Sequence, residues 1–333
     1  METRIAEEGL KGQVSKVPAL MIHARPIVCG GKWLRIAQIY DEAWLEGQPV
    51  ENPDEFLSAL QRCALKADLF TFTQSLPETE PKHPFHLEWD NWAVAVTSDF
   101  KAWWERLPQE SRKNVRRAER RGVVVRMVDW GEELALGIKG IYDETPVRQG
   151  RRFPHYGKDV ETVKRENSSY LERSQFIAAY HEDELIGFLK MVYVGPTARI
   201  MQILSKNCHF DKRPTNALLA KAVEVCSQRP ISCLIYGQYI YGNKTDSPVT
   251  EFKRRNGFHQ VLLPRYYVPL TWRGRVAIAA GLHRGFKTLL PGPILSWLLG
   301  IRQAVYQRVL VRSKARTVES HERQSRDSGE SET

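Results

Sequence analysis

Hydrophobic and polar positions along residues 175–268 predict a sheet with one inserted helix. Two apolar runs, QFIAAY and ELIGFLKMVYV, meet at the polar pair Glu182-Asp183, and ARIMQILS follows as a third run. Each run has the length of a strand. Residues 215–228 have helical spacing, ISCLIYG has the pattern of a buried strand, and the chain continues through TEFKRRNGFHQVLL. This order predicts an α+β (α/β) domain with a mixed, mostly antiparallel sheet flanked by helices.

A shorter version of the same order precedes it. ALMIHARPIVC and WLRIAQIY have the pattern of two strands around Gly30-Gly31. Asn52-Pro53-Asp54 begins a helix that is expected to run to about Ala67, and LFTFTQS and NWAVAVT follow as strands. The chain therefore predicts a reduced first half over residues 17–97 and a second half over 98–268.

Two helices are expected between these sheets. Ser98-Asp99 is placed to cap the first, and Ser111 to cap a second, very basic helix that ends at Gly122. Arginines recur on one face of the second helix at positions 112, 116 and 120. They are either a solvated face or a site for phosphates, which makes Arg116 and Arg120 candidate substrate-binding residues.

A dense polar and aromatic loop, DETPVRQGRRFPHYGKD, follows a helix expected over Glu132–Asp143. Long ordered loops of this kind are often functional, although an ordinary surface connection is the alternative. Its candidate substrate-binding residues are Arg148, Gln149, Arg151, Arg152, His155 and Tyr156.

Charge is unevenly distributed in the 333-residue chain, which has a formal net charge of +10. No acidic residue occurs from Phe252 to Val318. Pro291-Gly292-Pro293 interrupts the apolar stretch there, so short basic amphipathic helices are expected over 269–316, followed by a disordered tail over 317–333. Residues 270–316 suit an anionic membrane surface, or alternatively pack on the domain or form a dimer contact.

Several chemistries are disfavoured by what the sequence lacks. The five cysteines show no CxxC or Cys/His spacing, so no metal site is expected. GxSxG, P-loop and GxGxxG motifs are absent. The N-terminal residues lack a secretion signal, which favours a cytoplasmic protein, with peripheral association at the inner membrane.

The string LPQESRKNVRRAERRGVVV, followed by a strand-rich half ending in EFKRRNGF, resembles the FemAB-like branch of the GNAT superfamily. The resemblance covers about 17–268 and implies tandem GNAT-like halves. It also implies transfer of an acyl or aminoacyl group, from acyl-CoA or aminoacyl-tRNA, to an amine. IYDETPVRQGRRFPHYGK resembles members of an exopolysaccharide-linked group, so a small-molecule or lipid-linked precursor of the envelope or of a polysaccharide is the expected acceptor.

The chain departs from CoA-dependent GNAT enzymes at one turn. Those enzymes have R/Q-x-x-G-x-G/A before the central helix, where backbone N–H groups bind pyrophosphate. The matching residues here are Lys212, Arg213, Pro214, Thr215, Asn216 and Ala217. Proline removes one donor, and Thr215 has a Cβ where the backbone must approach phosphate. The candidate donor-binding residues are Lys212, Arg213, Thr215 and Asn216. The altered turn favours aminoacyl-tRNA over acyl-CoA as the donor.

The candidate catalytic residues lie near the end of the second half. The resemblance implies that Lys253, which follows Phe252, supports the oxyanion or the donor phosphate. Asp246 is the candidate base, with Glu144 second, and Tyr241 the candidate acid. Surface charge is the alternative role for Lys253, and a helix cap for Asp246. An inactive module that binds an anionic saccharide, lipid or nucleic acid is the alternative function.

Overall fold

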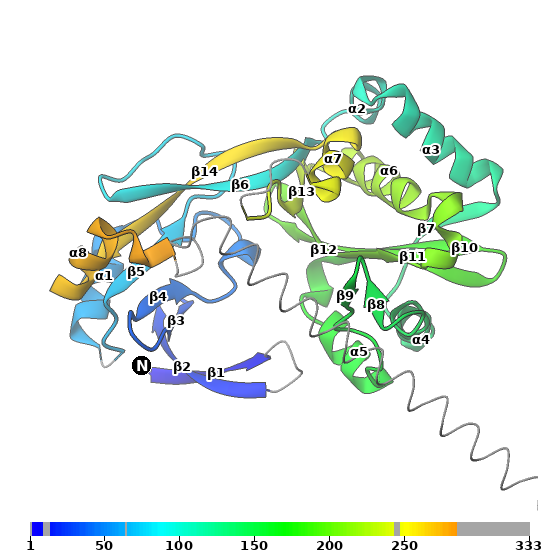
Figure 1. Ribbon diagram of the computed structural model, residues 1–333. Coiled ribbons are helices and arrows are strands. Elements are labelled where there is room, and N and C mark those ends of the chain that lie inside the picture. The colour runs from blue at the N-terminus through cyan, green and yellow to red at the C-terminus, as the bar shows by residue number, and fades with distance from the viewer. Residues whose placement is uncertain (1, 9–13, 64, 243–246, 285–333) are drawn as a thin grey trace, which may run out of the picture. The chain divides into compact units, whose positions relative to one another are not determined.

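The computed structural model describes residues 2–8, 14–63, 65–242 and 247–284. Twelve described strands form one continuous sheet in the order β1-β2-β3-β4-β5-β14-β6-β13-β12-β11-β10-β7 (Figure 1). In chain order these strands are β1 (Glu2–Glu8), β2 (Val14–Ile22), β3 (Arg25–Gly30), β4 (Ile36–Ile39), β5 (Leu69–Thr73), β6 (His86–Val96), β7 (Val123–Val128), β10 (Ser174–His181), β11 (Glu184–Val194), β12 (Thr197–Ser205), β13 (Cys233–Gln238) and β14 (His259–Pro269).

Helices and 3-10 turns connect the described strands along the chain. They are α1 (Pro53–Arg62), α2 (Phe100–Arg106), α3 (Gln109–Arg120), α4 (Glu132–Tyr142), α5 (Val160–Asn167), α6 (Pro214–Ser227), α7 (Pro248–Arg255) and α8 (Trp272–Ala279), with 3-10 turns η1 (Glu42–Trp44), η2 (Leu171–Arg173), η3 (Asn207–Lys212) and η4 (Leu282–Arg284). Among the described residues, none of these helices has the length and apolarity that crossing a membrane requires. The mixed, mostly antiparallel sheet and its helices confirm the predicted α+β class.

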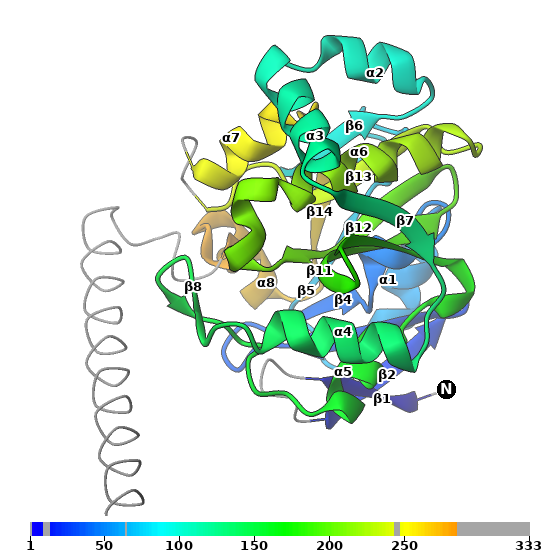
Figure 2. The same ribbon diagram turned by 90° about the vertical axis from the view of Figure 1, so that its right-hand side faces the viewer.

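The second half of the sheet packs helices on both faces. Figure 2 shows α6 and α3 against one face of β7 and β10–β12, and α4 and α5 against the other. Helix α6 is buried around most of its circumference because its sequence, PTNALLAKAVEVCS, is apolar on nearly every side. It anchors a hydrophobic core with residues of β11, β12 and β13.

The first half has its own core. Strand β5, LFTFT, is buried at every position, and α1 packs Phe56 and Leu60 towards Phe70 and Phe72. The two cores are joined by an exchange of strands. Strand β6 pairs with both β14 and β13, while β14 pairs with both β6 and β5. The long β6–β14 ribbon therefore belongs to both halves.

Several predicted helix ends are confirmed and two are wrong, the first being the end of α1, which lies at Arg62 and not near Ala67. Asn52 and Asp99 cap α1 and α2 with their side chains, and Gly122 ends α3 at φ +76°. Helix α3 begins at Gln109, however, so the predicted cap Ser111 is a buried residue within it. The preceding Pro108 has the extended backbone from which a helix can start, which places the cap three residues nearer the N-terminus than predicted.

A second compact unit comprises residues 146–153 with the chain after 278. Its hairpin pairs β8 (Val147–Arg148) with β9 (Arg151–Arg152). Gln149 and Gly150 both have positive φ, as a two-residue type I′ turn requires. The expected amphipathic segment over 269–316 is described only to residue 284, where α8 and η4 are helical, and the expected tail over 317–333 lies outside the described residues.

Candidate functional site

The central feature of the site is an opening between two parallel strands. Strands β12 and β13 pair over three rows, from Thr197↔Cys233 to Arg199↔Ile235. Strand β12 runs on to Ser205 and β13 to Gln238 without further pairing between them. We call this region the strand opening. Helix α6 begins beyond the far end of β12, as the sequence order predicts.

Side chains alternate across the strand opening. Ala198, Ile200, Leu234 and Tyr236 face the core around α6. Because successive residues of a strand point to opposite faces, Arg199 and its neighbours on β13 and β6 face the side that α4 and α5 cover. The opening therefore has two chemically different sides, an α6 side and an α4–α5 side.

Lys253 lies on the α6 side and is fully buried. Its Nζ donates to the carbonyl oxygen of Tyr236 at 2.7 Å, to that of Gln238, and to the hydroxyl of Tyr241 at 3.2 Å. The ammonium also lies 4.5 Å from the ring centroids of Tyr236 and Tyr241. Three N–H donors thus have three acceptors at the unpaired end of β13.

Burial without a carboxylate partner lowers the pKa of Lys253 to about 8. The ammonium is consequently held by carbonyl dipoles and aromatic faces alone. A lysine with a pKa near 8 can exchange a proton at neutral pH, which is a property of catalytic lysines as well as of buried structural ones. The burial shows that Lys253 is not surface charge.

Tyr241 connects Lys253 to solvent. Its side chain is 47 % exposed, and burial of the rest raises the pKa of its hydroxyl. Gly237, at φ +58°, lies beneath this hydroxyl, since a Cβ there would come within 3.0 Å of it. The hydroxyl accepts from the ammonium, which leaves its own hydrogen available to a further acceptor.

The predicted donor-binding residues surround the start of α6. Arg213 has a left-handed backbone (φ +60°), and its guanidinium lies 4.9 Å from the Phe210 ring, which is 65 % exposed. The Thr215 hydroxyl is 2.9 Å from that of Ser205, and Asn216 is buried, donating to Asn256 of α7 at 2.9 Å. Two of the four candidates are thus tied into packing.

Lys212, the remaining donor candidate, lies 3.9 Å from Asp211, which also pairs with Arg121 at the end of α3. The start of α6 therefore presents Lys212 and Arg213 beside an exposed aromatic ring. It does not present the glycine-rich backbone that binds pyrophosphate in CoA-dependent enzymes.

Glu144 has a clear structural role. Its two carboxylate oxygens accept from the backbone N–H groups of Asn207 and Cys208, both at 2.8 Å, and so hold the start of η3. Asp246, the other candidate base, lies outside the described residues, and Ser247 caps α7 by accepting from Thr250 N at 3.1 Å. Among the described residues, no carboxylate pairs with Lys253.

The predicted substrate-binding residues fall into three places. His155 stacks on Tyr142 with ring centroids 4.5 Å apart and lies near Glu166, whereas Tyr156 is 46 % exposed. Arg116 and Arg120 are exposed on α3, which packs on the α6 side of the sheet. Four others belong to the β8–β9 hairpin of the second unit: Arg148, Gln149, Arg151 and Arg152.

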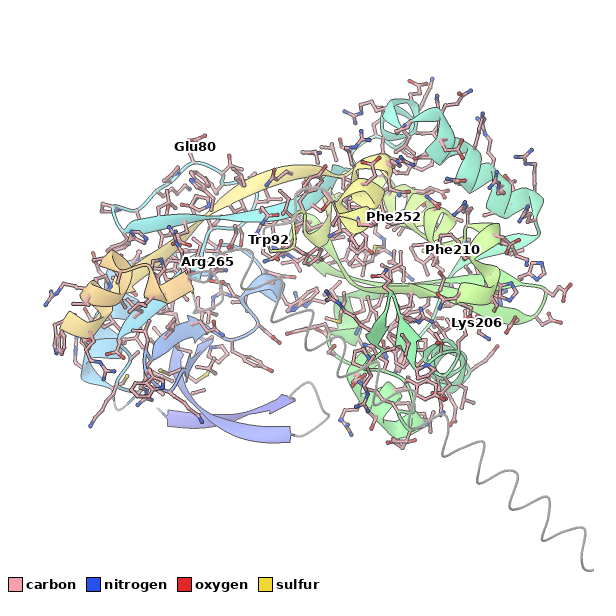
Figure 3. The ribbon with its side chains drawn as sticks, viewed as in Figure 1. Glu80, Trp92, Lys206, Phe210, Phe252 and Arg265 are labelled. Carbon is pink, nitrogen blue, oxygen red and sulfur yellow. The ribbon has the colours of Figure 1, made fainter. Side chains whose placement is uncertain are left out.

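Within the hairpin, the Arg148 guanidinium lies 4.6 Å from the Phe153 ring centroid, while Arg151 and Arg152 are exposed. Sequence reasoning missed a different group, on the α4–α5 side of the opening: Arg199, Trp92, Glu42, Asp90 and Arg265 (Figure 3 labels Trp92 and Arg265). Arginine inside an apolar strand, in TARIMQILS, was the available signal.

The continuous sheet, its strand opening and the two cores define a tandem GNAT-like fold. A crystal structure of FemX is similar, with a TM-score of 0.53 and 12% identity over 79% of this chain and 87% of FemX. A conserved protein of unknown function from Bacteroides thetaiotaomicron is similar at a TM-score of 0.51 and 10% identity, over 77% of this chain and 86% of that one. These likenesses confirm the FemAB-like resemblance at the level of the fold.

The C-terminal domain of a putative lysylphosphatidylglycerol synthetase from Agrobacterium fabrum is similar at a TM-score of 0.49 and 11% identity, over 79% of this chain and 88% of that domain. No protein-family model matches the chain, and no curated protein matches its sequence.

Proposed function

We propose that this protein transfers an acyl or aminoacyl group to an amine, with the reaction centre at the strand opening. The observation that carries the proposal is the buried Lys253, held at the opening by two backbone carbonyls and joined to the half-exposed Tyr241. A tandem GNAT-like fold supports it, because acyl and aminoacyl transfer is the activity that the FemAB-like resemblance implies.

In the proposed reaction, the acceptor nitrogen attacks the donor carbonyl carbon and forms the C–N bond. The C–O bond of an ester donor, or the C–S bond of a thioester, then breaks. Tyr241 donates its proton to the leaving atom, and Lys253 holds the hydroxyl and stabilises the developing charge. Lys253 is a positioning residue in this scheme because its three donors are engaged and its side chain is buried.

The proton that the acceptor amine loses requires a base. We assign this role to Asp246, seven residues before Lys253. Glu144 is less suited, because both of its oxygens already accept backbone hydrogen bonds.

We propose aminoacyl-tRNA as the donor, in preference to acyl-CoA. Pro214 removes an N–H group from the start of α6, and Thr215 places a side chain where a pyrophosphate-binding turn has glycine. Lys212 and Arg213 beside the exposed Phe210 ring instead suit a phosphate backbone and an unstacked base. The arginines at positions 116 and 120 of α3 add positive charge for the same polyanion.

The proposed acceptor is a small-molecule or lipid-linked amine from an envelope or exopolysaccharide precursor, met at the cytoplasmic side of the inner membrane. Trp33 and Trp272 support this location. Their side chains are 79 % and 68 % exposed, and Arg273 of α8 donates to the Trp33 carbonyl, which holds the two segments together. Exposed tryptophans flanked by cations are typical of membrane-water interfaces.

Donor binding tests the proposal first. Native mass spectrometry and calorimetry would compare acetyl-CoA, longer acyl-CoAs and charged tRNA on the full chain. Binding of charged tRNA, followed by aminoacyl transfer to an amine, is the expected result. Binding of acyl-CoA alone would reassign the donor and keep the reaction class. Binding of neither would refute the transferase function.

Flotation with anionic liposomes tests the membrane location separately. The W33A/W272A double variant is expected to float less than the native chain, and a chain ending at residue 284 to float at an intermediate level. Equal flotation of all three would remove the membrane assignment.

A further inference from the structure

Arg199 on β12 is a buried arginine at the base of the strand opening. Its side chain is 8 % exposed, and it occupies the last row in which β12 and β13 pair. Its guanidinium lies 4.7 Å from the Trp92 ring centroid on β6, on the α4–α5 side of the sheet. Arginine is rarely buried to this extent unless it is paired.

Arg199 has no such pairing. Its Nε has no hydrogen-bond partner, and no hydrogen bond or ion pair joins its guanidinium to any residue in the described ranges 2–8, 14–63, 65–242 and 247–284. The indole Nε1 of Trp92 is likewise buried without a partner. Burying donors without acceptors is costly, so two of them side by side on one face indicate an acceptor that comes from a ligand.

A neighbouring arginine shows the contrast. Arg265 on β14 donates from Nε to Asp90 at 2.7 Å and from a terminal nitrogen to Glu42 at 2.9 Å. Glu42 also accepts from the backbone N–H of Thr73 at 2.8 Å. The two partly buried carboxylates thus form their hydrogen bonds with Arg265 and the backbone. Neither is hydrogen-bonded to Arg199, on which Glu42 acts only through space.

The position of Arg199 relates it to the reaction. The next residue of β13 beyond its row is Tyr236, whose carbonyl holds Lys253 from the α6 side. Arg199 and the carbonyl that holds Lys253 thus lie in neighbouring rows of the strand opening.

We propose that Arg199 and Trp92 bind an anionic oxygen group, a carboxylate or a phosphate ester, of the acceptor molecule. This rests on the proposed function only for the identity of the molecule that carries the group. The guanidinium presents paired N–H donors that match carboxylate and phosphate geometry, and the Trp92 ring fixes its plane.

Binding of simple anions tests the site without any donor. The native protein, R199M and R229M would be titrated with acetate and with monomethyl phosphate at constant ionic strength, followed by calorimetry and thermal unfolding. Arg229 is the matched control, because its guanidinium stacks on Tyr193 at 4.8 Å but is exposed. One of the two anions is expected to bind the native protein and R229M, with affinity at least about tenfold lower in R199M.

Which of the two anions binds identifies the anionic group that the acceptor molecule carries. Acetate binding indicates an acceptor with a carboxylate, and monomethyl phosphate binding one with a phosphate ester. Without anion, R199M is expected to unfold at a temperature equal to or above that of the native protein, since it no longer buries an unpaired charge. Absence of binding to the native protein, or unchanged binding in R199M, would overturn the proposal. A failure of transfer with charged tRNA would leave these results unaffected, so the two proposals fail separately.

Discussion

Replacing Lys253 by methionine tests the central contact of the proposed site. The change keeps the length of a buried side chain and removes the donor to two carbonyls and to Tyr241. Lys190→Met is a matched control: Lys190 is also fully buried, has a pKa lowered to about 8 by burial, and donates to the carbonyls of Asn167 and Ser169 at 2.8 and 2.6 Å.

The effect on stability can be worked out from these contacts. A pKa lowered from 10.5 to about 8 costs the folded state about 3 kcal/mol at pH 7. Methionine removes this cost but takes the lysine donor from two part-buried carbonyls, at about 1–3 kcal/mol each. The opposing contributions are of similar size. Lys253→Met is therefore expected to stay folded, with a free energy of unfolding within about 2 kcal/mol of the native value.

The lowered pKa of Lys253 also determines the direction in which the free energy of unfolding changes with pH. The folded pKa of Lys253 lies below its unfolded value, so the unfolded state binds more protons above pH 8 and stability rises with pH. Between pH 8 and pH 9 each buried lysine contributes a rise of about 1 kcal/mol. Urea unfolding at these two pH values is expected to show that each methionine variant loses about 1 kcal/mol of the native rise.

Activity separates the two lysines. Transfer is expected to fall roughly 10²-fold in Lys253→Met, because Tyr241 loses the contact that positions it for proton transfer, and to stay close to native in Lys190→Met. Full transfer activity in Lys253→Met would refute the role of this lysine. A pH dependence of stability that is the same in the native protein and in both variants would refute the burial argument itself.

Other predictions follow from single contacts. Tyr241→Phe is expected to lower transfer while donor binding, measured by calorimetry, is unchanged, because the exposed hydroxyl acts on the leaving group; an equal loss of binding would contradict this. Gly274→Ala is expected to destabilise the protein by several kcal/mol, roughly as overpacking does, since its Cβ would lie 2.1 Å from the carbonyl oxygen of Asp68. Gly140→Ala, whose Cβ meets nothing within 4 Å in α4, is its control and should raise the thermal midpoint slightly. Ser247→Ala removes the cap of α7 and should cost about 1 kcal/mol in urea unfolding.

Local patterns in the sequence were sufficient for most of the fold. Alternation and helical spacing predicted the strands and the central helix of residues 175–268 but not α7, and capping residues such as Asn52 and Asp99 fixed helix starts. The exchange of β6 and β14 between the halves was not predicted. It depends on pairing between residues more than 160 positions apart, such as Val94 and His259, for which hydrophobic spacing carries no signal.

The candidate site was likewise predicted from the sequence only in part. The resemblance to a known branch of transferases singled out Lys253, and the structure adds that it is buried and bound to carbonyls. The role of Glu144 as a clamp for two backbone amides and the isolation of Arg199 depend on partners distant in sequence. Residue type alone does not distinguish a carboxylate that is free to act as a base from one already engaged.

The ribbon of β6 and β14 has a consequence for how the two halves could have evolved. The strand that holds Lys253 through its carbonyls, β13, is hydrogen-bonded on its other edge to β6, which follows the first-half strands in the chain. Loss of the first half would remove that support and leave the reaction centre at a sheet edge. The first half would then be kept as scaffolding even without chemistry of its own, because the proposed site depends on its hydrogen bonds.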